Sequence, residues 1–263
     1  MRYDSLRRAF GETMQRQRDS VSEDVQSLCG TARFEDIAAP VRKSILDAGR
    51  RLVFKPGQTI FEQGDPHTHT YIIEQGLVRT YYTSYTGRHI TLCYWSDGDL
   101  IGGPNFFGDT THVWSGVVTR QTRVIAIKGE TLRQLAMLMP QLAMWITDAA
   151  MFKLRWLSLL FQLQGTQSVS QRLPHLLYLL SEMYGVKEND VTVIRHCLNQ
   201  SEIAALLGTS RQWTNKAMVE LRQQGLVSVE QGRITILNLT GLLKCAVEGI
   251  PSRCDEMSKL STG

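Results

Sequence analysis

An arginine and a glutamine stand side by side at Arg211 and Gln212, near the start of a polar segment. A guanidinium group can donate two hydrogen bonds to O6 and N7 of guanine, and a carboxamide can pair in a similar bidentate way with adenine. Asn215 and Lys216 follow one helical turn later on the same face, within reach of bases or phosphates. These residue types at this spacing favour a helix that reads base edges in DNA. A solvated polar helix face is the alternative.

The segment from Leu198 to Asn238 contains the elements that would position such a helix. Asn199 or Ser201 can cap a first short helix, because short polar side chains accept hydrogen bonds from the free amides of a first turn. Gly208 can end that helix in left-handed backbone geometry. The Thr209-Ser210 pair can then cap a second helix, which carries the base-reading residues.

Two short runs after the second helix alternate apolar and polar residues, as half-buried strands do. They are Leu226–Val229 and Arg233–Ile236, with Glu230-Gln231-Gly232 between them as a turn. Two helices, a tight turn and such a hairpin predict a winged helix-turn-helix, which places its second helix in a major groove. A generic helical hairpin is the alternative.

The polar residues at both helix starts form the expected DNA-contacting set. Amides and hydroxyls at a helix start often bind phosphate oxygens, so the first helix is expected to contact the DNA backbone. Trp213 is open to two interpretations: contact with a thymine methyl group or sugar, or packing on the hairpin. The expected contacts are Asn199, Gln200, Ser201, Thr209, Ser210, Arg211, Gln212, Trp213, Asn215 and Lys216.

The segment from 51 to 128 contains short strand-like runs separated by glycines, which is typical of a small β barrel or jelly roll. Tyr71–Ile73 and Gln75–Tyr82 are predicted as two strands, because both are rich in β-branched and aromatic residues. Ser115–Thr119 and Arg123–Lys128 are likewise predicted as two separate strands.

A long apolar stripe follows in the segment from Gly129 to Gly165, which is predicted to be helical with a break near Pro140. Its apolar residues recur at steps of three and four. One barrel is not expected to cover so long a stripe, so a parallel coiled coil with a second copy of the chain is predicted. The alternative is a helix packed wholly on its own barrel. The stripe consists of Trp145, Ile146, Ala149, Phe152, Trp156, Leu160 and Leu163.

The remaining segments are predicted to be shorter helices and connections. Phe34–Leu46 is expected to be a helical piece that leans on the barrel, Ser168–Tyr184 a further helix, Gly185–Asp190 a linker, and Thr240–Val247 a short helix. The expected division of the chain is an N-terminal extension with helices (1–50), a barrel (51–128), a dimerisation helix (129–167), a winged helix-turn-helix (168–240), and a C-terminal helix and tail (241–263).

The composition is that of an ordinary globular protein, with 263 residues, 43% hydrophobic residues and a formal net charge of +4. A weakly basic chain permits nucleic-acid binding without demanding it. No apolar run is long enough to cross a bilayer, and the first residues lack the apolar core of a signal peptide. A cytoplasmic protein without a membrane partner is therefore expected.

Metal sites and catalytic sites have little support in the sequence. His67 and His69 lie in a polar turn, where surface exposure is expected. A cupin-like metalloenzyme would need two or three histidines and a carboxylate on neighbouring strands, and that set is missing. Haem binding by His67, His69, His89 or His112, or redox sensing, is a further alternative, although no local pattern supports it. No CxxC spacing occurs among the cysteines, which are Cys29, Cys93, Cys197, Cys245 and Cys254.

Several motifs occur in one order along the chain from about Phe54 to Leu237. They are Pro56-Gly57, Gly64-Asp65, Gly76, Gly98-Asp99-Leu100-Ile101-Gly102, Ser201-Glu202-Ile203-Ala204 and Gly208-Thr209-Ser210-Arg211. Together with the barrel, long helix and winged helix, this order resembles the superfamily of the cyclic-AMP receptor protein and the fumarate–nitrate reductase regulator (Crp/Fnr).

The resemblance implies an α+β fold with a cyclic-nucleotide-binding-like β jelly roll, a long dimerisation helix and a C-terminal winged helix-turn-helix. It implies a homodimeric, non-enzymatic transcription regulator that binds a palindromic double-stranded operator, with RNA polymerase as a further partner. The half-sites would lie about one helical turn (~34 Å) apart. The base- and phosphate-contacting positions would fall on Ser210, Arg211, Gln212 and Lys216.

Gln212 departs from the family pattern, because many members carry a glutamate at this position. A carboxylate accepts a hydrogen bond from cytosine, whereas an amide prefers adenine. A changed base preference is therefore predicted at one base pair of each half-site.

The segment that the resemblance assigns to an effector pocket departs as well. Members that bind cyclic nucleotide carry a glutamate after the pocket glycine and an arginine some ten residues on, but here Gly103 and His112-Val113-Trp114 stand there. A buried phosphate without a charged partner is costly, so cyclic AMP is not expected to bind in the usual way. Two alternatives remain: the pocket binds an unknown effector of apolar or aromatic character, or it is filled by core side chains. The assigned residues are Gly102, Gly103, Asn105, Phe106, Phe107, His112, Val113 and Trp114.

Overall fold

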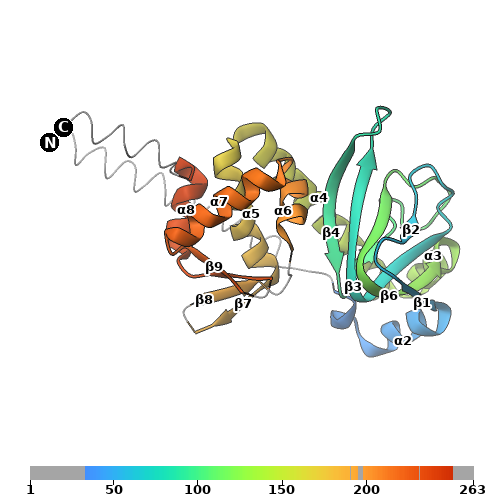
Figure 1. The fold of residues 1–263 in the computed structure, drawn as a ribbon. Helices are drawn as coiled ribbons and strands as arrows, with labels where there is room; N and C mark the ends of the chain where they lie inside the picture. Colours follow the sequence, from blue (N-terminus) through green and yellow to red (C-terminus); the bar gives the residue numbers. More distant parts are fainter. Residues whose placement is uncertain (1–32, 190, 195–197, 231, 251–263) are drawn as a thin grey trace, which may run out of the picture. The chain divides into compact units, whose positions relative to one another are not determined.

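The computed structural model describes residues 33–189, 191–194, 198–230 and 232–250. The chain divides between Ser158 and Leu159 into two compact units (Figure 1). Within the described ranges, no helix is both long and apolar enough to span a membrane.

The first unit is built on an antiparallel sheet in the order β1-β6-β3-β4, with β2 paired to β6 and β5 paired to β3 (Figure 1). The long central strands hold the shorter ones around them, which gives the barrel predicted from the glycine-separated runs. The strands are β1 (Arg50–Phe54), β2 (Thr59–Phe61), β3 (His69–Thr83), β4 (His89–Ser96), β5 (Leu100–Ile101) and β6 (Ser115–Lys128).

The prediction of two separate strands at Tyr71–Ile73 and Gln75–Tyr82 is wrong, because β3 runs through both, and β6 likewise runs through the two predicted strands at Ser115–Thr119 and Arg123–Lys128. Gly76 has a φ of +125°, and a Cβ atom there would lie 2.3 Å from Thr122 Oγ1. The same hydroxyl accepts a hydrogen bond from the Leu77 amide at 3.1 Å. The pairing of β3 with β6 therefore shifts register at this point, as in a β bulge, and both strands continue beyond it.

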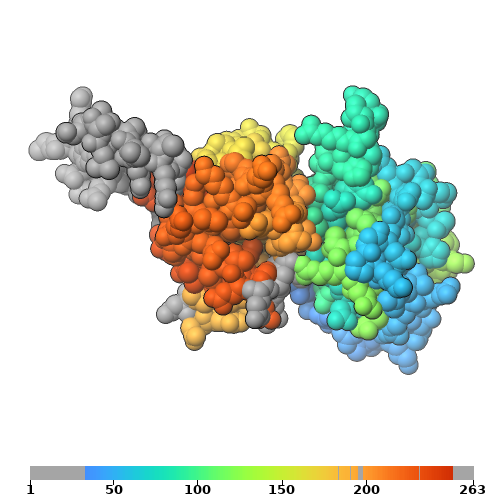
Figure 2. Space-filling model, viewed as in Figure 1, coloured from blue at the N-terminus to red at the C-terminus, as the bar shows by residue number. Residues whose placement is uncertain are grey.

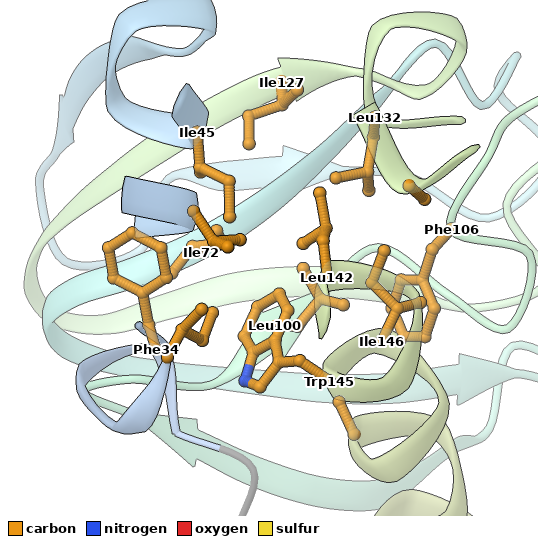
Figure 3. Close-up of a cluster of buried hydrophobic side chains, with 14 of the residues drawn as sticks. Phe34, Ile45, Ile72, Leu100, Phe106, Ile127, Leu132, Leu142, Trp145 and Ile146 are labelled. Atoms are coloured by element: carbon orange, nitrogen blue, oxygen red, sulfur yellow. The ribbon is translucent and has the colours of Figure 1, made fainter. Parts of the chain in front are cut away.

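Helices before and after the sheet close one side of the barrel (Figure 3). Phe34 comes from a 3₁₀ turn (η1, Phe34–Asp36), and its ring lies 6.1 Å from that of Trp145 between centroids. Ile45 comes from α2 (Ala39–Ala48) and is fully buried. The expectation of a helical piece at Phe34–Leu46 that leans on the barrel is confirmed by η1 and α2, and residues 1–32 lie outside the described residues.

The long helical segment is split as expected at Pro140 into α3 (Gly129–Leu138) and α4 (Pro140–Thr166). Proline fits the first helical position because it has no amide hydrogen to leave unpaired there. On α4, the Phe152 ring meets Trp95 of β4 edge-on, with centroids 6.4 Å apart. Trp156 Nε1 donates a hydrogen bond to the Leu92 carbonyl at 3.4 Å. This face of α4 therefore packs on β4 of the same chain.

The inference that the apolar stripe of α4 needs a partner helix is wrong. Each of its seven side chains is at most 6% exposed within a single chain. The barrel core and β4 extend far enough along α4 to cover the part that belongs to the first unit. The residues in that part are Trp145, Ile146, Ala149, Phe152 and Trp156, while Leu160 and Leu163 are also buried and lie beyond the division at Ser158.

The second unit begins with the end of α4 and contains α5 (Val169–Tyr184), as predicted. The expected linker that follows is instead a hairpin, β7 (Gly185–Glu188) and β8 (Val191–Ile194). Asn189 takes a left-handed φ of +56° in its turn. The hairpin extends the wing into one sheet, in the order β7-β8-β10-β9. Its strands are too short to give a clear alternation in sequence.

The winged helix-turn-helix prediction is confirmed in its elements. The remaining helices and strands are α6 (Gln200–Leu207), α7 (Arg211–Gln223), β9 (Val227–Glu230), β10 (Arg233–Ile236) and α8 (Leu239–Glu248). The tail from 251 to 263 and the wing residue Gln231 lie outside the described residues.

Candidate nucleic-acid interface

Asn199 is the residue that caps α6. Its Oδ1 atom accepts hydrogen bonds from the amides of Ser201 (2.9 Å) and Glu202 (3.0 Å). The buried Glu202 carboxylate in turn accepts the Asn199 amide at 2.7 Å, which completes a capping box. Because the side chain of Asn199 holds two of the first-turn amides, Gln200 and Ser201 are the residues left to offer polar groups to a ligand at this helix start.

The turn between the two helices has the predicted geometry. Gly208 lies in the left-handed region with φ 66° and ψ 31°. Ser210 caps α7 by accepting a hydrogen bond from the Trp213 amide at 3.1 Å. Thr209 does not cap the helix in this way: its hydroxyl forms a hydrogen bond of 3.0 Å with the hydroxyl of Thr214 in the first turn of α7. These contacts set the direction in which α7 leaves the turn.

The two faces of α7 differ in character. Its inner face is buried and consists of Thr214, Ala217, Met218 and Leu221. Its outer face carries the exposed side chains of Arg211, Gln212, Asn215 and Lys216, while Trp213 is half-buried. The helix crosses the near side of its unit in Figure 1, and Figure 2 shows this surface open to solvent. A polar outer face on a firmly capped helix is what base reading requires.

A groove of about 510 Å³ opens between the start of α6, the start of α7 and the wing. It brings together four of the expected contacts, Asn199, Gln200, Ser201 and Arg211, while the other six expected contacts lie outside its lining. Apolar side chains form its floor. The remaining lining residues are Leu198, Ile203, Met218, Val229, Gly232 and Ile234.

The residues assigned to the effector pocket differ in burial. Gly102, Gly103 and Phe106 are buried, and Phe106 is part of the hydrophobic core (Figure 3). Asn105 stabilises the loop locally, since its Nδ2 donates to the Gly108 carbonyl at 2.5 Å and its Oδ1 accepts the Phe107 amide at 3.2 Å. These contacts are those of a packed loop.

Phe107 and Trp114 are only half-buried, and Val113 is 44% exposed. Arg133 of α3 lies 5.5 Å above the Phe107 ring and forms an ion pair of 2.6 Å with Asp109. Val113 is therefore an exposed side chain, and Phe107 is held by a cation–π contact.

His112 is buried in a stack of rings inside the barrel. Its ring lies 4.5 Å from Phe61 and 4.3 Å from His67, between centroids. Burial, helped by the neighbouring His67, lowers the pKa of His112 to about 4, against smaller opposing effects of Asp65 and the Gly102 backbone. The imidazole is therefore neutral at pH 7.

The expectation that His67 lies at the surface is wrong. It is 5% exposed, and burial lowers its pKa as well. Its Nε2 lies 3.4 Å from Thr70 Oγ1. The turn is polar in sequence, but its position over His112 places the ring inside the barrel. His69 is half-buried and lies against Thr68, with 2.9 Å between Nδ1 and Oγ1.

Among the described residues, no three or more His, Cys, Asp or Glu side chains gather as metal ligands. Cys93 and Cys245 are free and buried, and burial raises the pKa of both thiols. Low thiolate content makes both poor nucleophiles. Cys29, Cys197 and Cys254 lie outside the described residues.

One buried charge was not anticipated from the sequence. Lys153 of α4 places its Nζ 3.6 Å from the centre of the Trp95 ring on β4. Burial lowers the pKa of Lys153 and raises that of Asp99, while each of these two charges opposes the shift of the other. A lysine beside an apolar stripe is usually a solvated flank, so no sequence signal singled it out.

Barrel and winged helix-turn-helix together define a two-domain DNA-binding protein with a sensor-like fold. The cyclic nucleotide-binding domain model matches residues 51–138, and the Crp-like helix-turn-helix domain model matches residues 171–245. The CRP-like cAMP-activated global transcriptional regulator of Mycobacterium tuberculosis is 26% identical over 193 residues, which cover 70% of this chain and 82% of that protein. The transcriptional activator protein FnrA of Stutzerimonas stutzeri is 26% identical over 209 residues, covering 78% and 82%.

Solved structures share the same fold. FixK2 from Bradyrhizobium japonicum superposes with a TM-score of 0.65 at 18% identity, over 74% of this chain and 96% of that one. A CooA variant from Carboxydothermus hydrogenoformans gives a TM-score of 0.67 at 18% identity, over 77% and 89%. The chain belongs to the Crp/Fnr superfamily of DNA-binding transcription regulators.

Proposed function

We propose that this protein acts as a homodimer that binds a palindromic operator, with α7 of each copy in a major groove. The observation that carries the proposal is the exposed polar face of α7, which begins at the capped Ser210 with Arg211 and Gln212. Arg211 is proposed to pair with guanine and Gln212 with adenine. Asn215 and Lys216 are proposed to contact bases or phosphates farther along the groove.

The dimer is proposed to form through the exposed face of α4, not through its buried stripe. Four large apolar side chains remain in solvent there: Met144 (63%), Met151 (43%), Leu154 (58%) and Phe161 (79%). Their steps of seven, three and seven residues follow a heptad pattern, which puts them on one seam. A second copy of the same helix, related by a twofold axis, would cover all four. This face is called the α4 seam below.

The phosphate contacts are proposed to lie in the groove between α6 and the wing. Gln200 and Ser201 line it without being needed for the α6 cap, and Arg211 lines it from α7. A DNA strand that passes this groove would meet two polar side chains and one cation. Contacts of this kind fix the register of a protein on DNA without specifying sequence.

The barrel is proposed not to bind cyclic AMP in the usual way. His112 stands within a ring stack, and neutral imidazole does not offer the charge that a cyclic phosphate needs. Any effector would then have to differ in chemistry from a cyclic nucleotide. The protein is further proposed to act in the cytoplasm without catalysis, and to exert its effect through RNA polymerase.

The test is selection of bound sequences from a random duplex pool, with and without cyclic AMP. Palindromic half-sites about one helical turn apart are expected, with an adenine at the pair that Gln212 reads. Gln212→Glu should restore a preference for cytosine at that pair and leave the other positions unchanged. If no sequence is enriched over the starting pool, the proposal of sequence-specific DNA binding is contradicted. If the selected site changes when cyclic AMP is added, the effector proposal is contradicted.

A further inference from the structure

Val219 is an apolar side chain on the polar outer face of α7. It is 39% exposed and is not among the residues that bury the inner face of this helix. It follows Asn215 by four residues and Lys216 by three, so all three share one stripe of the helix surface. Among the described exposed side chains of α7, which are Arg211, Gln212, Asn215, Lys216, Val219, Arg222 and Gln223, Val219 alone lacks a polar group.

Helix stability does not explain a valine at this position. A β-branched residue loses side-chain freedom in a helix, and lysine, glutamine or alanine would favour the helix more. Val219 is also not one of the buried residues of α7, which form its inner face. The exposed part of its side chain is therefore free to meet something outside the chain.

The major groove of DNA exposes one apolar group, the 5-methyl of thymine. We propose that Val219 contacts the methyl group of a thymine in each half-site and thereby contributes to sequence specificity. This inference rests on the proposed function, in which α7 is the helix that enters the groove.

The position of that thymine follows from the geometry of a helix. Val219 lies seven residues after Gln212, which corresponds to about 10 Å along the helix axis. At 3.4 Å per step this is about three base pairs. The thymine is therefore expected about three base pairs from the pair that Gln212 reads.

The experiment replaces each thymine of the selected half-site in turn by deoxyuridine, which keeps the base pair and lacks the methyl group. The full-length dimer is titrated with each duplex by fluorescence anisotropy. One position is expected to weaken binding about fourfold per half-site, as for one methyl group no longer removed from water. Val219→Ala should bind thymine and uracil duplexes equally at that position.

Arg222→Ala is the matched control, because Arg222 is exposed on the next turn of the same helix. The Arg222→Ala variant should show the same loss of affinity on uracil substitution as the wild type. Val219→Thr keeps one methyl group and should show part of that loss. Uracil sensitivity that persists unchanged in Val219→Ala, or that is absent in the wild type at every thymine, overturns the inference. If the wild type shows no sequence-specific binding to any duplex, the proposed function is overturned instead.

Discussion

Replacement of Leu154 by alanine should weaken the dimer without unfolding the chain. Leu154 exposes 58% of its surface in one copy. Full burial of a leucine side chain stabilises by about 1.5–3 kcal/mol, so burial of this remaining part in the α4 seam contributes about 1–2 kcal/mol per copy. The twofold pair doubles this to about 2–4 kcal/mol, which raises the dimer Kd about 30- to 700-fold.

Sedimentation velocity over a concentration series measures this Kd directly. Val53→Ala is the matched control, because Val53 is 61% exposed on β1 and lies off the α4 seam. It should leave the dimer Kd unchanged. A second contrast is Trp156→Ala, which opens a cavity in the buried stripe and should lower the free energy of unfolding by about 3–5 kcal/mol. A dimer that is unaffected by Leu154→Ala would refute the seam.

Further predictions concern four substitutions in the DNA-binding unit and the barrel. Arg211→Ala should reduce operator affinity by about 1–3 kcal/mol and relax the choice at one base pair, whereas Lys216→Ala should weaken binding to all duplexes and lower the salt slope by about 1 if it contacts phosphate. Both are measured by titration at several salt concentrations. Asn199→Ala should lower the free energy of unfolding by about 1 kcal/mol through loss of the α6 cap, measured by urea denaturation. The fourth substitution concerns pH: because the folded-state pKa of His112 lies near 4, below its unfolded value of 6.5, its contribution to stability is present above pH 6.5 and is lost as pH falls toward 4. Urea denaturation at pH 7 and pH 5 should show a smaller loss in His112→Phe than in the wild type.

The winged helix-turn-helix could be predicted from the sequence because its signals are local. Asn199, Gly208 and Ser210 each act on backbone groups within a few residues, and the structure places each where the pattern requires. The exposed positions of Arg211 and Gln212 follow from the same helix start. The roles of these residues at DNA stay predictions.

The parts of the fold that differ from the sequence predictions depend on contacts between distant segments. The period of the α4 stripe shows that one face is buried, but it does not show what buries it, and β4 through Trp95 does so. His67 is buried because His112, which lies 45 positions later in the chain, packs against it. The sequence predicts a linker at the β7–β8 hairpin because strands of four residues carry too little alternation to be recognised.

Two apolar faces on α4 have a consequence for its length. The inner face is matched to the barrel through Trp145, Phe152 and Trp156, and the α4 seam occupies another side of the same turns. One inserted residue would rotate everything after it by about 100° around the helix axis. Both sets of contacts would then be lost together. An insertion of seven residues would return the later side chains to their original directions but would move them about 10 Å along the helix axis, away from their contacts on β4. Insertions and deletions between Trp145 and Trp156 should therefore be poorly tolerated at any length.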